Sequence, residues 1–416
     1  MKKIQNAFKG DRVVWVVFFF LCIISLIEVY SAASTLTYSS GSFWSPLIKQ
    51  AVFLGVGTLI VVGIHNVPCR YFKLIPILLL VPTYALLLFT SLYGAMVNGA
   101  SRAIPIFGFQ FQPLELGKGV TVVTTALILA SLQNEEGADR RAFKWVLITA
   151  GIMCALIFPE NLSTSVLLFG VVLIMMFIGR VSLIQLGKLL GVLMLFAASA
   201  VMLVKCLPDD KESAVYDLPG LHRLSTWVNR VETHGEMSKE VAPEDFDIDK
   251  DAQIAHAHIA IATSNVVGKM PGNSVERDFL SQAFSDFIFA IIIEEMGIWG
   301  AAIVFFLYIV LLFRAGRIAS RCEHNFPAFL IMGLALLLVV QAVMNMLVAV
   351  GIMPVTGQPL PLISRGGTST LMSCVYIGMI LSVSRYARRR EESANRVTPA
   401  EEPDVDPNYY NTANLI

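Results

Sequence analysis

Charged residues are scarce in this sequence, and their scarcity excludes most soluble folds. Lys, Arg, Asp and Glu make up 15% of the 416 residues, whereas a soluble globular domain carries about a quarter. The 31 basic and 31 acidic residues cancel, so net charge gives no attraction for a nucleic acid. Hydrophobic residues account for 56% of the chain, which is typical of an integral membrane protein.

Cysteine is also sparse, and its spacing excludes the common cysteine-based sites. The chain has six cysteines, and no two of them form a C-x-x-C pair. Most of them fall in or beside apolar runs. We therefore interpret them as small apolar residues in helix contacts, rather than as a disulfide framework or a metal site.

Long apolar runs are what the sequence has in abundance. About 20 apolar residues in a helix cross a hydrocarbon core of about 30 Å. The chain therefore predicts an all-α polytopic membrane protein with about ten transmembrane helices. The predicted spans are residues 13–34, 47–64, 74–92, 114–131, 143–158, 161–179, 183–206, 287–313, 327–350 and 366–386.

The distribution of Lys and Arg predicts the orientation of these spans. Basic residues gather in alternate connecting segments, from Lys2 and Lys3 at the start to Arg388, Arg389 and Arg390 at the end. Because such segments stay in the cytoplasm, we expect a protein of the cytoplasmic (inner) membrane with both termini on its cytoplasmic side.

Two segments differ in composition from the membrane domain, which we expect to cover residues 1–390. A large outer loop, about 207–285, separates the seventh and eighth spans and has an acidic middle between Glu232 and Asp251. We interpret this charge run as a solvated surface, with short amphipathic helices beside it. The polar tail, 391–416, is predicted to be a disordered cytoplasmic segment.

An ionisable residue within the membrane requires a partner or a role, because inserting it costs about 2.5–3.5 kcal/mol. Glu115 and Lys118 lie three residues apart on one helix face and are expected to pair. A purely structural ion pair is one interpretation. The other adds Arg102, just before this helix, and forms a cationic vestibule that suits a pyrophosphate.

Asp286 lies at the start of the eighth span and is followed directly by Phe287-Ile-Phe-Ala290. It suits an N-cap position. Apolar neighbours also raise the pKa of a carboxylate towards the range of a general base. Glu294 and Glu295 lie about 12 Å further along the helix, and we expect them to pair within the bundle.

The segment after the ninth span is rich in proline and glycine, from Gly351 through Pro354-Val-Thr-Gly-Gln-Pro-Leu-Pro to Ser369. Such a composition forbids a regular helix. Irregular backbone at membrane depth persists only where it is buried in protein or lines a wet cavity. We therefore predict a re-entrant loop that lines a cavity.

Four of these segments together resemble the SEDS family of shape, elongation, division and sporulation proteins. The first is the G-A-x-R…Q-P-x-E-x-x-K stretch between Gly99 and Lys118, and the second is the turn at Asn161-Leu-Ser-Thr164. The third is the S/T-D-F-I-F-A…E-E-x-G stretch from Ser285 to Gly297, and the fourth is the loop from Pro354 to Ser369. The resemblance runs from the first helix to Arg390.

The resemblance implies a SEDS fold and an inverting peptidoglycan glycosyltransferase that polymerises lipid II at the outer face of the membrane. It implies Asp286 as the catalytic base. For binding substrate and its pyrophosphate it implies the set Arg102, Glu115, Lys118, Asn161, Ser364 and Arg365. A divalent cation, Mg²⁺ or Mn²⁺, is left open, with Glu115 and Asp286 as its candidate ligands. No organic cofactor is implied.

Some residues depart from the family pattern. Ala103 stands where the family often has tryptophan, Asn161 replaces an aspartate, Phe284 replaces a histidine and Arg365 replaces a tyrosine. The Pro-Val-Thr-Gly-Gln sequence of the fourth motif, the Ser281-Gln-Ala-Phe-Ser-Asp286 segment and the basic tail favour the division type over the elongation type. The division type implies a septal location, a class B penicillin-binding transpeptidase as partner, and other membrane proteins of the division machinery. A lipid II flippase and a non-catalytic scaffold are the alternatives.

Overall fold

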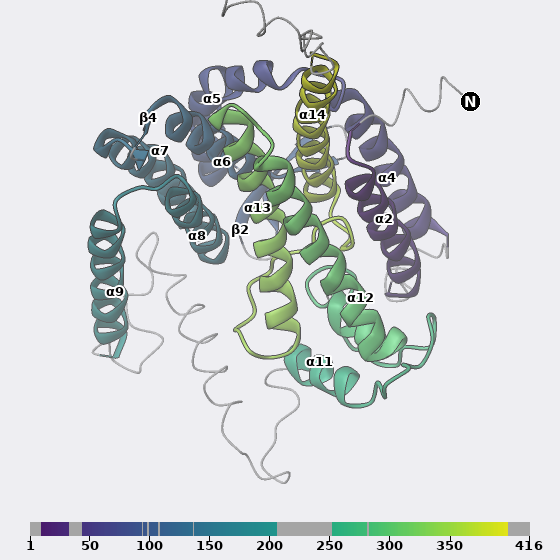
Figure 1. Cartoon of the computed structure of the whole chain (residues 1–416). Helices are drawn as coiled ribbons and strands as arrows, with labels where there is room; N and C mark the ends of the chain where they lie inside the picture. The colour runs from purple at the N-terminus through teal and green to yellow at the C-terminus, as the bar shows by residue number, and fades with distance from the viewer. Residues whose placement is uncertain are drawn as a thin grey trace, which may run out of the picture.

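The computed structural model describes residues 10–32, 44–93, 95–97, 100–106, 109–135, 137–205, 252–280 and 283–397. Helices dominate it (Figure 1). In the described residues a helix lies at each of the ten predicted spans. These helices are α2 (Arg12–Ala32), α4 (Ser45–Ile64), α5 (Leu74–Tyr93), α6 (Pro113–Ser131), α7 (Arg140–Ile157), α8 (Leu162–Ile178), α9 (Leu183–Lys205), α12 (Ile288–Ala319), α13 (Asn325–Ala349) and α14 (Gly367–Val397).

Seven of the described helices are long and apolar enough to cross a membrane, and α8 and part of α9 are shorter apolar helices. The helices differ in how deeply they lie in the bundle. α6, α13 and α14 are largely buried, whereas most residues of α4 and α5 lie outside the buried core. Because a lipid bilayer solvates apolar surface, exposed Leu and Val side chains on α5 are expected for a helix at the rim.

α6 and α13 pack on each other at the centre, with α12 against α13 and α14 against α4. α14 runs past residue 391, where the tail was predicted to begin, and the residues after Val397 lie outside the described part. The acidic middle of the predicted outer loop also lies outside it. Beyond that region the loop forms α11 (Ala252–Ala262) and the short 3-10 helix η2 (Glu276–Asp278).

A small antiparallel β-ribbon connects α5 to α6, and the sequence did not predict it. Its strands are β1 (Ala95–Val97), β2 (Ala100–Ile106) and β3 (Phe109–Phe111), in the order β1-β2-β3. Strands this short leave no readable alternation between apolar and polar residues. The ribbon carries Arg102 on β2, whose side chain lies outside the described residues. Two further short strands, β4 (Gln133–Asn134) and β5 (Gly137–Ala138), and the 3-10 helix η1 (Cys69–Lys73) lie in other connections.

α12 contains a kink at Gly297, where the backbone has φ 67° and ψ −167°. The kink frees carbonyl groups of the preceding turn, and residues 263–277, here called the strap, satisfy them. The amides of Lys269 and Met270 donate to the carbonyls of Glu294 and Glu295 at 2.9 and 2.8 Å. The strap and the first turns of α12 therefore share one hydrogen-bonding network.

The two glutamates of the kink also bind the strap through their side chains. Glu294 forms an ion pair with Lys269 at 2.7 Å and accepts from Ser274 Oγ at 2.5 Å. Glu295 accepts from Ser31 of α2 and from the amide of Ser274. Both side chains are fully buried. The partners predicted for Glu294 and Glu295 within the bundle are thus supplied mainly by the strap, with Ser31 of α2 as a further partner.

We expect Gly297→Ala to destabilise the protein. The backbone at this position lies in a region that is nearly exclusive to glycine, which costs another residue about 1–3 kcal/mol. An added Cβ would also lie 2.3 Å from the carbonyl oxygen of Val266. Thermal unfolding in detergent measures the loss. Gly151→Ala is the matched control, because nothing lies within 4 Å of its added Cβ, and an equal melting temperature for both variants would contradict the prediction.

Candidate functional site

The predicted re-entrant loop lies between α13 and α14 and turns back into the bundle. Leu360, Leu362 and Ile363 are buried, although none of them is in a helix. Tyr308 of α12, itself buried, donates its hydroxyl to the carbonyl of Pro361. The loop is therefore buried in protein, as expected for irregular backbone at membrane depth.

Asp286 lies in the turn that enters α12, beside this loop. Its side chain is half-buried, and Oδ1 accepts from Ser285 Oγ at 3.0 Å. The N-cap residue of α12 is Phe287, and no side chain caps the helix. Asp286 precedes that position, so the interpretation of Asp286 as the N-cap is wrong. Gly357 of the loop faces the carboxylate, because a Cβ there would lie 3.7 Å from Oδ2.

Two predicted residues of the loop hold this turn through its backbone. Ser364 Oγ donates to the carbonyl of Ser285 at 2.6 Å, and the amide of Arg365 donates to the carbonyl of Phe284 at 2.9 Å. The Arg365 guanidinium lies 5.4 Å from the centre of the Phe284 ring, a cation–π arrangement. Burial lowers the pKa of Arg365 below its ordinary value. Arg365 therefore supplies a positive charge next to the Asp286 turn.

Asn345, near the end of α13, connects the Asp286 turn to the loop. Its Nδ2 donates to the carbonyl of Asp286 at 2.8 Å and to the carbonyl of Gln358 at 2.7 Å. Asn345 is 1% exposed, so its amide group is shielded from bulk water. Asn345 thus fixes the position of the Asp286 backbone relative to the loop.

Glu115 and Lys118 form the predicted ion pair, and it lies in the core. Lys118 Nζ contacts both carboxylate oxygens of Glu115 at 2.9 Å. The third contact of Lys118 is Gln341 Oε1 of α13 at 2.8 Å, and Gln341 Nε2 donates to the carbonyl of Pro359 at 2.9 Å. Lys118 is fully buried. The structure therefore shows Lys118 bound to Glu115 and to Gln341, which connects it to the loop, rather than open to a vestibule.

Asn161 occupies the N-cap of α8, where its Oδ1 accepts from the amide of Thr164 at 3.0 Å. An asparagine fills this position as well as the aspartate common in the family. Thr164 Oγ1 in turn accepts from Gln358 Nε2 at 2.6 Å. The second motif therefore also ends on the loop.

The structure brings the four motifs together around residues 354–366. The residues predicted for this site were Glu115, Lys118, Asn161, Asp286, Ser364 and Arg365. The residues that connect them had no predicted role, and these are Thr164, Ser285, Gln341, Asn345 and Gln358. A usable signal existed for two of these. Gln341 and Asn345 are amides inside an otherwise apolar span, and buried amides require hydrogen-bond partners. The β-ribbon is attached as well, since Thr368 Oγ1 of α14 donates to the carbonyl of Gln110 at 2.9 Å.

The candidate cation ligands do not form a metal site by themselves. Both oxygens of Glu115 are engaged by Lys118, and a metal ion would have to compete with that ammonium group. Among the described residues no group of three or more His, Cys, Asp and Glu side chains is placed to hold an ion. Glu115 therefore does not fit the role of a metal ligand.

Comparison with known proteins assigns the family. The family model for FtsW, RodA and SpoVE, described as "Cell cycle protein", matches residues 11–389. The chain belongs to this family. It is similar to the probable peptidoglycan glycosyltransferases FtsW of Halomonas elongata (30% identical, covering 90% of this chain and 91% of the relative) and of Coxiella burnetii (27%, covering 89% and 95%). Stage V sporulation protein E of Bacillus subtilis is 27% identical, covering 91% and 98%.

Solved structures confirm the SEDS fold. A chain of a peptidoglycan synthase complex, described as coordinating polymerization and crosslinking, superposes with a TM-score of 0.69 at 21% identity and covers 91% of this chain and 98% of its own. The rod shape determining protein RodA of Thermus thermophilus gives 0.59 at 22% identity, covering 90% and 97%. The protein is thus a multi-pass, all-helical membrane protein of the SEDS family.

The position of Asn345 gives a testable expectation. Asn345→Asp keeps the size of the side chain but removes the donor to the carbonyls of Asp286 and Gln358, and a buried carbonyl without a partner costs about 1–3 kcal/mol. Since the resemblance implies Asp286 as the catalytic base, displacing it slightly should also lower the rate, on the order of 10-fold or more. Thermal unfolding and a lipid II polymerisation assay measure the two effects. Full activity at unchanged stability would contradict the positioning role.

Proposed function

We propose that this protein is a peptidoglycan glycosyltransferase that polymerises lipid II into β-1,4 glycan strands. The observation that carries the proposal is the convergence of four family motifs on one loop, with the Asp286 carboxylate beside Gly357. Its support comes from the FtsW relatives, which are named probable peptidoglycan glycosyltransferases and match nearly the whole chain.

In the proposed reaction, the 4-hydroxyl oxygen of one lipid-linked disaccharide attacks the anomeric carbon of the other chain. A C–O bond forms there with inversion, and the bond from that carbon to the pyrophosphate oxygen breaks. The undecaprenyl pyrophosphate leaves with the electron pair, and the hydroxyl proton passes to the Asp286 carboxylate. Such general base catalysis contributes about 10²–10⁴-fold.

The residues around Asp286 have distinct parts in this proposal. Ser285, Ser364 and Asn345 position the turn through the hydrogen bonds described above. Arg365 and Arg102 offset the charge of the leaving pyrophosphate, a role that arginine suits because its guanidinium binds phosphate oxygens in pairs. Lys118 and Glu115 stabilise the loop through Gln341. A requirement for Mg²⁺ or Mn²⁺ stays a prediction, and metal titration of the wild type tests it.

The purified full chain and fluorescent lipid II test the activity, with and without a class B transpeptidase. We expect glycan ladders on a gel from the wild type and none from Asp286→Ala. Ladders of equal strength from both would remove Asp286 from the mechanism. Transfer of labelled lipid II across vesicle membranes without any ladder would assign the protein to transport. If neither transfer nor ladders were observed, the non-catalytic scaffold would be favoured.

We further propose that the protein acts at the outer face of the cytoplasmic membrane, at the division septum, with both termini inside. The FtsW relatives and the placement of Lys and Arg support this. The expected partners are a class B penicillin-binding transpeptidase and other division membrane proteins. Depletion in the source cell should give filaments. Spheres would instead indicate the elongation role of RodA.

A further inference from the structure

The strap, residues 263–277, turns its charged side chains towards the protein. Each of its three charged residues contacts a polar group of the protein. These contacts are Lys269 with Glu294 at 2.7 Å, Arg277 with Ser31 at 3.1 Å and Glu276 with His256 at 2.6 Å. A loop that lies in water normally exposes its charges, whereas charged residues within a membrane face the interior of the bundle.

The side chains that the strap exposes most are apolar. Four of them have more than half of their surface outside the protein. These are Val266, Val267, Met270 and Val275, with exposed fractions of 58, 69, 60 and 54%. Apolar side chains outside and charged side chains inside is the distribution of a segment that contacts lipid.

The strap continues the lipid-facing side of α12. Beyond the kink, exposed apolar residues follow one another on α12 at steps of three or four, the spacing of one helical face. These residues are Trp299, Ile303, Phe306, Ile309 and Phe313, with exposed fractions of 66, 49, 62, 43 and 65%. Before the kink none of residues 288–297 is exposed. There the strap lies against the helix, since a Cβ on Gly297 would lie 2.3 Å from the carbonyl oxygen of Val266.

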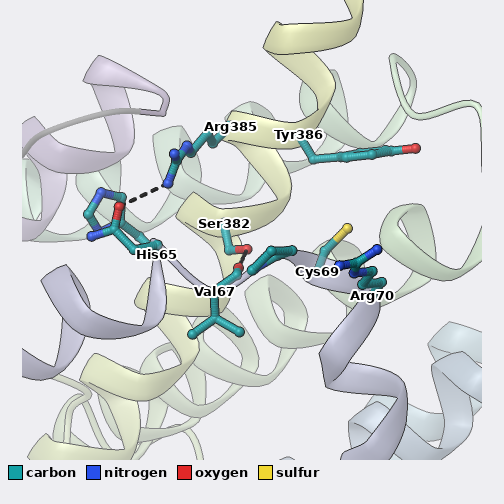
Figure 2. A pocket seen from close by; sticks show the side chains of 9 residues that line it. His65, Val67, Cys69, Arg70, Ser382, Arg385 and Tyr386 are labelled. Atoms are coloured by element: carbon teal, nitrogen blue, oxygen red, sulfur yellow. Dashed lines mark hydrogen bonds between the residues drawn. The ribbon is translucent and has the colours of Figure 1, made fainter. Parts of the chain in front are cut away.

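The other end of the same helices is marked by charged side chains. Arg314 of α12 forms an ion pair with Asp11, just before α2, at 2.6 Å. It lines one cavity together with Ser384 of α14. The next residue of α14, Arg385, lines a second cavity of about 250 Å³ and donates to Asn66 Oδ1 at 2.9 Å (Figure 2). Because such side chains lie at the edge of a hydrocarbon core rather than within it, the Asp11–Arg314 pair marks one edge.

Two helices give the distance of the strap from this edge. Ser31 follows Asp11 by 20 positions, or about 30 Å along α2, and its hydroxyl oxygen accepts from the strap amide of Gly272 at 3.1 Å. Glu295 precedes Arg314 by 19 positions, or about 28 Å along α12, and its carbonyl accepts from another strap amide at 2.8 Å. A tilted or kinked helix covers less depth than its length, so both distances are upper limits. Since a hydrocarbon core is about 30 Å thick, the strap lies at its second edge and not in the water beyond it.

We propose that the strap is inserted into the interfacial region of the lipid bilayer, with Val266, Val267 and Met270 against the acyl chains. In the orientation given under the proposed function, this is the outer leaflet. Trp299 beside the strap fits this level, because tryptophan is enriched at membrane interfaces. The non-helical backbone of the strap stays among the headgroups, where water reaches it. Since the strap is bonded to the first turns of α12, its insertion anchors those turns at the lipid surface.

Fluorescence quenching in a lipid bilayer tests the proposal. The full chain carries a dansyl amino acid in place of Val267 or Met270, introduced by stop-codon suppression, and is reconstituted into phosphatidylcholine nanodiscs. Nitroxide groups near the headgroup end of the acyl chains quench a probe in lipid, whereas iodide quenches a probe in water. Two matched controls carry the probe at Trp299, on the lipid-facing side of α12, and at His324, an exposed residue just before α13.

We expect the nitroxide lipids to quench the probes at Val267 and Met270 as strongly as the probe at Trp299. Iodide should quench them several times less than the probe at His324. Iodide quenching equal to that at His324 would show that the strap lies in water and would overturn the proposal. Protection from both quenchers would show that protein covers the strap, a second copy or a partner, and would also overturn it. Unchanged melting temperatures establish that the labelled chains are folded, and no readout depends on polymerisation, so a failure here is distinct from a failure of the proposed function.

Discussion

Asp286→Asn is expected to lower the rate of glycan polymerisation by about 10²–10⁴-fold, the usual contribution of a general base. The amide has nearly the same shape but cannot accept the hydroxyl proton. Because Asp286 is half-buried and its backbone carbonyl accepts from Asn345, the turn retains its position in the variant. Gel assays of single-turnover polymerisation measure the rate, and thermal unfolding should show little change.

Asp278→Asn is a suitable control for this experiment. Asp278 is an exposed acid eight residues earlier in the chain, in η2, so it makes the same chemical change outside the site. We expect it to retain the wild-type rate. A comparable loss from both variants would indicate a general effect of charge at this face, and Asp286 would lose its special role. A loss in Asp286→Asn alone, with KM for lipid II unchanged, is the signature of a group that acts in the chemical step.

Lys118→Met is expected to give the largest loss of stability, about 3–5 kcal/mol in the free energy of unfolding. The substitution leaves the buried carboxylate of Glu115 without its cation and Gln341 Oε1 without its donor. Because Gln341 also donates to the carbonyl of Pro359, the loop around Asp286 should loosen as well. Unfolding in detergent, followed by circular dichroism, measures the loss.

The double variant Glu115→Gln/Lys118→Met separates the two roles considered for Lys118. Removing both charges abolishes the unpaired buried carboxylate, so most of the stability should return. If Lys118 acts through the fold, polymerisation returns with the stability. Recovered stability together with a raised KM for lipid II would instead show that Lys118 binds the pyrophosphate of the substrate.

The sequence predicted the helices well because hydrophobic length is a direct consequence of bilayer thickness. The pairing of Glu115 with Lys118 was equally accessible, since three residues along a helix place two side chains on one face. The buried position of Lys118, in contrast, could not be predicted from the sequence. Its burial depends on Gln341, 223 residues later, and no local pattern reports which distant amide will face a given cation.

The same limit applies to the loop. Its prolines and glycines predicted irregular backbone inside the protein, and Leu360, Leu362 and Ile363 are buried accordingly. That Ser364 and Asn345 would hold the backbone of the Asp286 turn could not be read from the residues, because these contacts join segments far apart in the chain. The β-ribbon was missed for another reason. Its strands are only three to seven residues long and are stabilised through contacts such as that of Thr368 with Gln110.

The kink at Gly297 divides α12 into two parts that have different contacts. Its first turns carry the Asp286 turn and are bonded to the strap through Lys269, Met270 and Ser274, whereas the remainder continues to Arg314 and the far end of the bundle. We therefore expect a displacement of the strap to move the Asp286 turn more than the half of α12 beyond the kink. In hydrogen–deuterium exchange, the amides of Lys269 and Met270 should lose protection together with the first turns of α12, and ahead of the half beyond the kink.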